Sequence, residues 1–162
     1  MARIFIFLLL LFGPTSLAGA SEVEHVGVAS LIENVVAIGT GINGNDSLLR
    51  QGDRVFANQK ITTFMNSRAQ IIFLDQSVIN IGSRSELLIK LFEPSKKDSS
   101  FLAEIKSGIV RFKSGALPIG SYTVTSPNTR VKLKGTEVDF LVTKGGSTEV
   151  LLRSGAASVS AK

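Results

Sequence analysis

The stretch Thr123–Val142 constrains the fold more than any other, because it contains two alternating strands whose phases do not match. Val131 and Leu133 have odd numbers and alternate with polar residues, which is the pattern of a half-buried strand. A one-residue change of phase turns every side chain to the other face unless the chain bends or bulges. The sequence therefore predicts a β-bulge or a corner at Gly135. The apolar residues after that glycine have even numbers: Val138, Phe140 and Val142.

Two residues beside this phase change carry further predictions. Pro127 cannot donate to a ladder of backbone hydrogen bonds and favours extended geometry in Ser126 before it, so it marks a boundary of the stretch. Thr136 follows Gly135, and we expect a buried hydroxyl that fastens the bulge rather than a ligand contact. Both residues are therefore expected to serve the fold.

Strand-like segments are short and turn signals are frequent in the rest of the chain. This pattern favours an all-β fold over an α/β arrangement. We predict a single all-β domain of many short strands, arranged as a β-sandwich, a roll or a solenoid-like fold. Loops are expected at 39–46 and 94–100, and a hairpin turn at 145–146. The expected strands are 26–32, 34–38, 54–56, 61–63, 69–74, 78–81, 87–92, 101–105, 109–113, 121–125, 130–133, 137–143, 149–152 and 157–161.

One short pattern occurs three times, each time between strand-like segments: an apolar residue, a basic residue, a small polar or amide residue, and then glycine. Glycine adopts positive φ at little cost, so we expect corners of the chain at these positions. The distances between the three copies are unequal, which favours recurring corner chemistry over a true repeat array. The three glycines are Gly52, Gly108 and Gly155.

Several of these motifs together resemble the FecR domain, an all-β periplasmic module first known from iron-dicitrate signalling. The order T-x-S-P and then V-x-L-K-G-T at 123–136 is similar to the family pattern, as is L-x-x-G-D-x-V at 49–55. The segment 67–75 is similar to a family strand that ends in Asp-Gly-Ser, although Gln76 stands in place of the glycine. The resemblance covers roughly positions 27 to 160. It implies an interaction module of envelope sensing or signalling, for example one that pairs an open strand edge with a partner strand.

The N-terminal part departs from the signalling members of this family. Those proteins carry a cytoplasmic anti-sigma segment and a membrane helix before the FecR domain, whereas only Met1, Ala2 and Arg3 precede the apolar run here. We likewise expect no receptor-docking lobe of the kind that follows the domain in those proteins, given the 162 residues of the chain. We therefore do not carry the transmembrane relay over to this chain.

The first 20 residues have the features of a Sec-type signal peptide. Arg3 precedes nine apolar residues at 4–12, and Ala18-Gly19-Ala20 forms an A-x-A cleavage site. The apolar run is shorter than the about 20 residues of a membrane span, and Pro14 interrupts it, which favours cleavage over an uncleaved anchor. We expect cleavage after Ala20, a domain at 21–162 with no stable membrane span, and a periplasmic or secreted location.

The composition is that of one globular domain, with 44% hydrophobic residues and no cysteine. A domain of about 150 residues buries roughly 70% of its unfolded surface, so it needs neither a disulfide nor a metal for stability. The lack of cysteine excludes a lipoprotein anchor, but it does not indicate the cytoplasm, since secreted domains of this size fold on core packing alone.

Catalytic and metal-binding residues are scarce. His25 is the only histidine and lies outside the family resemblance, so we expect neither a nucleophilic triad nor a zinc site. Asn43, Asn45 and Asp46 are conceivable calcium ligands, but a plain turn explains them better because the terminal acidic ligand of an EF-hand is missing. No carboxylate pair for glycan cleavage can be picked out. We therefore expect no enzyme activity, no metal and no cofactor.

Asp53 and Asp75 are the acidic residues that match the family pattern. Each carboxylate can contact a ligand, or it can accept hydrogen bonds from the backbone of its own turn. The second interpretation is the simpler one, so we class both residues as structural.

Positive charge is the remaining functional signal. The chain has a net charge of +5, which falls to +4 when Arg3 leaves with the signal peptide. Arg130, Lys132 and Lys134 alternate along one expected strand and form a positive row on one face. Such a row can bind an anionic envelope polymer or an acidic protein. Lysines on an exposed strand also prevent edge-to-edge association without binding anything.

Two functional hypotheses follow. The first is a protein-interaction module with an envelope protein as its partner. The second is a binder of an anionic envelope polymer or a small ligand through the basic row, whose affinity falls as salt screens the charges. Nucleic acid is not an expected partner, because the compartment is wrong and no exposed aromatic residues interleave with the basic ones.

Overall fold

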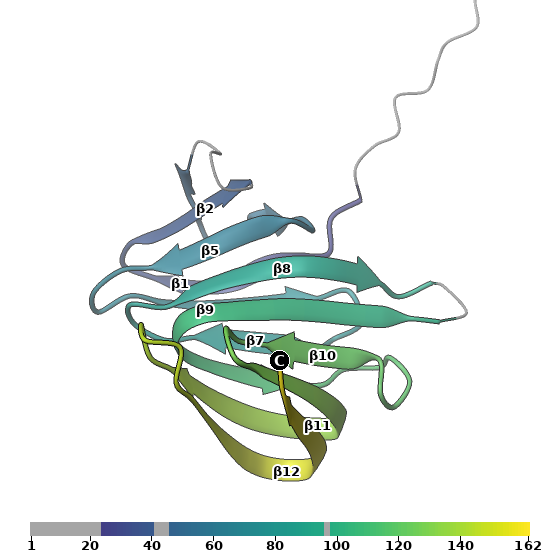
Figure 1. Ribbon diagram of the computed structural model, residues 1–162. Coiled ribbons are helices and arrows are strands. Elements are labelled where there is room, and N and C mark those ends of the chain that lie inside the picture. Colours follow the sequence, from purple (N-terminus) through teal and green to yellow (C-terminus); the bar gives the residue numbers. More distant parts are fainter. Residues whose placement is uncertain (1–23, 41–45, 96–97) are drawn as a thin grey trace, which may run out of the picture.

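The computed structural model describes residues 24–40, 46–95 and 98–162, and within them it contains strands and no helix (Figure 1). The all-β prediction is therefore confirmed. The expected signal peptide and the residues Asn43 and Asn45 lie outside the described part of the chain. The strands are β1 (Gly27–Glu33), β2 (Val36–Thr40), β3 (Ser47–Leu48), β4 (Arg54–Val55), β5 (Gln59–Thr63), β6 (Arg68–Phe73), β7 (Val78–Ile81), β8 (Glu86–Glu93), β9 (Ser100–Lys113), β10 (Tyr122–Thr125), β11 (Thr129–Val142) and β12 (Thr148–Ala161).

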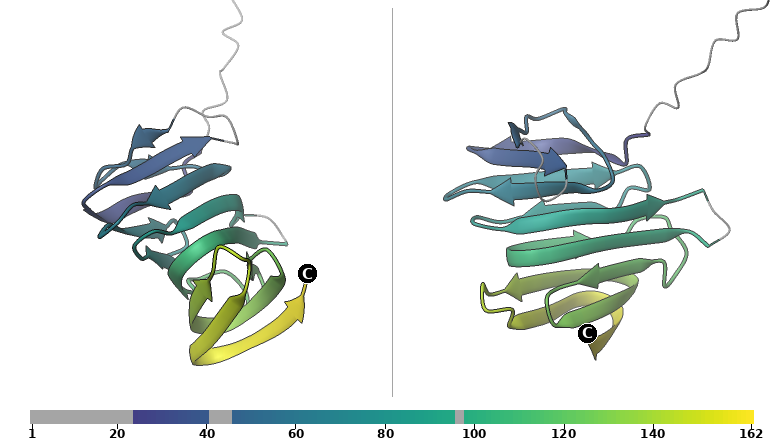
Figure 2. Two further views of the ribbon diagram at one scale, coloured as in Figure 1. Left: turned by 60° about the vertical axis from the view of Figure 1, so that its left-hand side comes forward. Right: turned by 45° about the horizontal axis from the view of Figure 1, so that its top comes forward.

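These strands form one sheet that curls over on itself into two facing layers (Figure 2). Layer 1 contains β3, β2, β5, β8, the first half of β9, β10, the first half of β11 and the second half of β12. Layer 2 contains β4, β1, β6, β7, the second halves of β9 and β11, and the first half of β12. The strands lie roughly one above another, so the molecule is a stack with β2 and β3 near one end and β12 at the other (Figures 1 and 2).

The long strands β9, β11 and β12 pass from one layer to the other at the glycines that the sequence marked as corners. In β9, residues 101–104 pair with β10, whereas residues 108–113 pair with β7 and β11. The register of β11 against β12 shifts between Lys134 and Glu137, where Gly135 has a φ of 60°. The prediction of two separate strands on either side of each glycine is wrong, because the hydrogen-bond ladder continues through these bends.

The core lies between the two layers, because buried and less buried side chains alternate along strands such as β6, β8 and β11. Phe101 in layer 1 meets Phe73 of layer 2 edge-on, with ring centroids 5.0 Å apart. It also contacts Phe112 of layer 2 at 5.2 Å and Tyr122 of its own layer at 5.8 Å. This aromatic cluster fastens the two layers together at the middle of the stack.

Buried hydroxyl groups hold the bends of neighbouring strands together along the edges of the stack. On one edge, the Thr63 hydroxyl donates to the carbonyl of Gly82 at 2.5 Å and accepts from the Ser85 N–H at 2.9 Å. The Ser85 hydroxyl in turn accepts from the N–H of Ile109, next to the bend of β9. The layers are therefore joined by ordered polar contacts as well as by the core.

The two ends of the stack are built differently. Residues 47–55, which we call the cap segment, cross from layer 1 to layer 2 and place the buried side chain of Leu49 over the end of the core. The Leu49 N–H donates to the carbonyl of Val36 and the Gly52 N–H to that of Ala29, so the segment is tied to both layers. At the other end β12 pairs with β11 alone, and no described residue pairs with its far edge.

Candidate functional site

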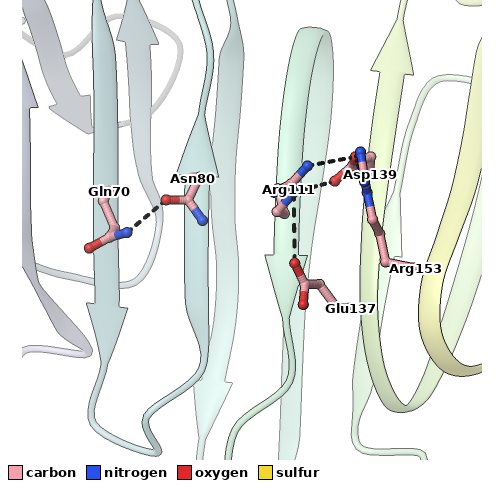
Figure 3. A network of polar contacts seen from close by, with 6 residues as sticks. All are labelled: Gln70, Asn80, Arg111, Glu137, Asp139 and Arg153. Atoms are coloured by element: carbon pink, nitrogen blue, oxygen red, sulfur yellow. Dashed lines mark hydrogen bonds and ion pairs between the residues drawn. The ribbon is translucent and has the colours of Figure 1, made fainter.

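A row of polar side chains crosses the outer face of layer 2 from strand to strand (Figure 3). The Gln70 amide donates to Asn80 Oδ1 at 2.7 Å and accepts from the Ser30 hydroxyl at 2.8 Å. Asn80 stands opposite Arg111 in the register of β7 and β9, and Arg111 stands opposite Asp139 in the register of β9 and β11. We call Ser30, Gln70, Asn80, Arg111, Asp139 and Arg153 the polar row.

The charged part of this row is centred on the half-buried carboxylate of Asp139. Arg111 donates to it through two nitrogens, with Nε–Oδ1 at 2.6 Å and Nη2–Oδ2 at 3.0 Å. Arg153 of β12 approaches the same carboxylate, with Nη2 2.6 Å from Oδ2. Hydrogen bonding to Arg111 holds the pKa of Asp139 below its ordinary value, and Arg153 adds to this effect against the opposing effect of burial. Asp139 therefore stays ionised and fixes the orientation of both guanidinium groups.

A shallow groove of about 660 Å³ lies along the polar row. Gln70, Asn80, Arg111 and Asp139 contribute polar atoms to its lining, and Leu31 and Ile109 contribute apolar surface. Ile109 is 55% exposed, and its neighbour on the next strand, Leu141, is 40% exposed. The outer face of layer 2 thus combines oriented polar groups with exposed apolar side chains.

The outer face of layer 1 is basic. Arg130, Lys132 and Lys134 all point outward from the first half of β11, while Val131 and Leu133 between them are buried in the core. The structure therefore places the three predicted binding residues together in one exposed row.

A buried carboxylate on the same face gathers three more cations. Glu104 of β9 is only 5% exposed. The ammonium groups of Lys90, Lys106 and Lys162 lie 2.5, 2.8 and 3.7 Å from its oxygens. Burial opposes ionisation of Glu104, but the hydrogen bonds and charges of Lys106 and Lys90 outweigh it and lower its pKa to about 2. We call these three lysines and the row of Arg130, Lys132 and Lys134 on β11 the basic face.

The carboxylates of Asp53 and Asp75 both accept hydrogen bonds within their own turns, and Asp75 also accepts one from Tyr122. The Asp53 carboxylate accepts from the Arg50 N–H at 2.7 Å within the cap segment. The Asp75 carboxylate accepts from the N–H and hydroxyl of Ser77, and its other oxygen accepts a hydrogen bond from the Tyr122 hydroxyl. Burial raises the pKa of Tyr122 and the bond to Asp75 raises it further. Gln76, at the place of the family glycine, has a φ of 66°.

The remaining motif residues lie at turns and bends. Gly52 is in the turn of the cap segment, and Pro127 is in the turn between β10 and β11, beside Gly146. Gly108 lies so close to Ser85 that an added Cβ would be 2.1 Å from the Ser85 hydroxyl oxygen. The Thr136 hydroxyl is buried; it donates to the carbonyl of Ala156 at 2.7 Å and accepts from the Lys134 N–H at 2.8 Å.

The residues considered for catalysis and metal binding are described only in part, since Asn43 and Asn45 lie outside the described residues. His25 lies half-buried just before β1. Asp46, the described member of the possible calcium loop, lies 4.0 Å from the ammonium group of Lys60. Across residues 24–40, 46–95 and 98–162 no group of three or more histidine, cysteine or acidic residues is placed to hold a metal ion. The same ranges contain no helix that is long and apolar enough to span a membrane.

Sequence reasoning missed both the polar row and the lysines around Glu104. Each member of the polar row sits at an outward position of its strand, but the six residues come from six strands spread over positions 30–153. Only the pairing of those strands brings them together. Alternation within each strand indicates which side chains point outward. The sequence does not indicate which strands pair or in which register.

Comparison with known proteins supports the resemblance seen in the motifs. Residues 59–158, more than half of the chain, match the sequence profile of the family described as FecR protein. Proteins of this family are generally regulatory rather than catalytic, and they work through protein interactions in signalling. No curated protein and no solved structure matches the chain.

Proposed function

The chain belongs to the FecR family, and from this premise we propose that it is a non-enzymatic interaction module that recognises an envelope protein in sensing or signalling. The N-terminal sequence supports a periplasmic or secreted place of action. The outer face of layer 2 is the surface that we assign to the partner.

The observation that carries this proposal is the polar row. Ser30, Gln70 and Asn80 are joined by hydrogen bonds, and Asp139 is bonded to both Arg111 and Arg153. These side chains are oriented before any partner arrives, so binding costs less conformational entropy than it would on a loose surface. The groove places apolar Leu31 and Ile109 beside these oriented donors and acceptors. Protein interfaces commonly combine such features, with apolar contact area at the centre and specific hydrogen bonds around it.

An in-cell crosslinking pull-down tests the proposal. The tagged full chain is expressed in its source cell, crosslinked, and purified from the envelope fraction with washes at low and high salt. We expect one protein partner that survives the high-salt wash. Replacing Ile109 by Glu should remove this partner, because the change puts a charge into the groove without touching the hydrogen bonds of the polar row.

A matched variant of the other face serves as the control. Changing Arg130, Lys132 and Lys134 together to Gln should leave the partner bound. Equal recovery with Ile109→Glu and the unchanged chain would contradict the assignment of layer 2.

The basic face supports a second candidate function, the binding of an anionic envelope polymer or a small anionic ligand. The cations of the basic face attract polyanions, and the attraction weakens as salt screens it. This function predicts recovery of polysaccharide or many acidic proteins at low salt only. It also predicts that the triple Gln variant loses binding while Ile109→Glu keeps it.

A further inference from the structure

The far edge of β12 is a long strand edge without a partner among the described residues. An unpaired strand edge offers backbone N–H and C=O groups to another strand, and proteins usually shorten, charge or cover such edges. β12 is 14 residues long, and only Glu149 and Arg153 within it carry charge. Leu151 is 57% exposed and Leu152 is 45% exposed. This edge therefore lacks most of the features that keep strands apart.

The first half of β12 carries a pattern that is complementary to itself. Glu149, Leu151 and Arg153 are spaced two residues apart, so they lie on one side of the strand, with the acid and the base placed symmetrically about the leucine. Arg153 already contacts Asp139, and no described residue forms an ion pair with Glu149. An antiparallel copy of the same strand would supply the missing partner.

We propose that β12 binds β12 of a second copy of this chain, in antiparallel pairing centred on Leu151. In this register Leu151 faces Leu151 of the other copy, and Glu149 faces Arg153 on both sides of the two-fold axis. Val150 then faces Leu152, which covers apolar surface that is exposed in the single chain. The two curled sheets join end to end, each through its open end.

The charges select this register over its neighbours. Centring the pair one residue earlier places Glu149 opposite Leu151, and centring it one residue later places Arg153 opposite Leu151. Both alternatives leave a charge against an apolar side chain, whereas opposite charges that face each other across a strand pair are stabilising. The pairing uses the edge of the sheet and leaves the groove open, and Arg153 is the one residue that it shares with the polar row.

Cysteine crosslinking tests the proposal cleanly, because the natural chain contains no cysteine. Opposite residues of an antiparallel pair have Cα atoms about 4.5–5.5 Å apart, which is within disulfide reach. The full chain with Leu151→Cys should therefore form a covalent dimer under mild oxidation. Ile119→Cys is the matched control, since Ile119 is an exposed apolar residue outside the strands. We expect about tenfold more covalent dimer from Leu151→Cys than from this control, because only facing cysteines are held within reach.

Two further variants test the register. Glu149→Cys should not crosslink to itself, but it should crosslink to Arg153→Cys when the two proteins are mixed. Glu149→Arg should weaken the dimer in sedimentation experiments, because two like charges then face each other. A Leu151→Cys chain that stays monomeric, or one that crosslinks no better than Ile119→Cys, would overturn the proposal. Self-crosslinking of Glu149→Cys equal to that of Leu151→Cys would overturn the register.

Discussion

The two ends of the stack treat the edge of the sheet in opposite ways: one end covers it, and the other leaves it unpaired among the described residues. At the N-terminal end, the cap segment 47–55 lays two-residue strands β3 and β4 against the layers and covers the core with Leu49. At the C-terminal end, β12 presents 14 residues of unpaired edge, and Leu152 remains 45% exposed. A curled sheet can therefore be closed at one end and remain ready for pairing at the other.

The physical difference lies in how much backbone each end leaves unpaired. Strands of two residues offer too few donors and acceptors to bind another strand, which is a common way to prevent aggregation. A strand of 14 residues offers many, and its bend at Gly155 lets it present them along both layers. The comparison predicts a stability difference between the middle of the stack and the open end.

The largest effect is expected in the aromatic cluster at the middle of the stack. Phe101→Ala removes a ring that is 1% exposed and leaves a cavity between the layers. We expect a loss of about 3–5 kcal/mol in the free energy of unfolding, measured by urea denaturation. A loss below about 1 kcal/mol would show that the layers are not fastened there.

The next effect concerns the attachment of β12 at its bend. A Cβ on Gly155 would lie 2.0 Å from the carbonyl oxygen of Gly135, and Gly155 has a φ of 81°. A Cβ on Gly135 meets nothing within 4 Å, although its φ of 60° is also positive. Gly135→Val should therefore destabilise the fold by about 1–3 kcal/mol through backbone strain alone. Gly155→Val should lower the free energy of unfolding by more than Gly135→Val does, because its Cβ also collides with the backbone. A higher denaturation midpoint for Gly155→Val than for Gly135→Val would contradict this view of the bend.

A smaller effect is expected at Glu104, which ties the end of β12 to the middle of the stack through Lys162. The lowered pKa of Glu104 means that its ion pairs contribute stability at neutral pH. This contribution should be lost as the pH falls from near 4.5 to about 2.

Replacing Glu104 by Gln checks this pH dependence. We expect a loss of about 1 kcal/mol at pH 7, because exposed lysines are partly screened by solvent. The difference between variant and natural chain should shrink below pH 4 and at high salt. A constant difference across this pH range would exclude ion pairing as its cause.

The smallest effect is expected at the open end. Leu152→Ala removes a side chain that is already 45% exposed, so the isolated chain should lose less than about 1 kcal/mol. The loss should grow with protein concentration if β12 pairs with a second copy, since Leu152 then becomes buried. Urea denaturation at low and high protein concentration measures both values.

The sequence alone predicted the all-β class and the phase change at Gly135, because both depend on alternation within single segments. It failed to predict that β9, β11 and β12 continue through their glycines, since a bulge and a strand end leave the same local signature. The link from Asp75 to Tyr122 was missed because 47 residues separate them. The polar row and the lysines of Glu104 were missed for the same reason, since they depend on strand register.

Hydrogen exchange along β12 tests the contrast between the two ends most directly. At low protein concentration, the amides on the far edge of residues 148–154 should exchange fast, while those of β1, which pairs with β4 and β6, should be protected. At high concentration the β12 amides should become protected while those of β1 stay unchanged. Strong protection of β12 at the lowest concentration, or rapid exchange that no concentration slows, would contradict an open edge that pairs with a second copy.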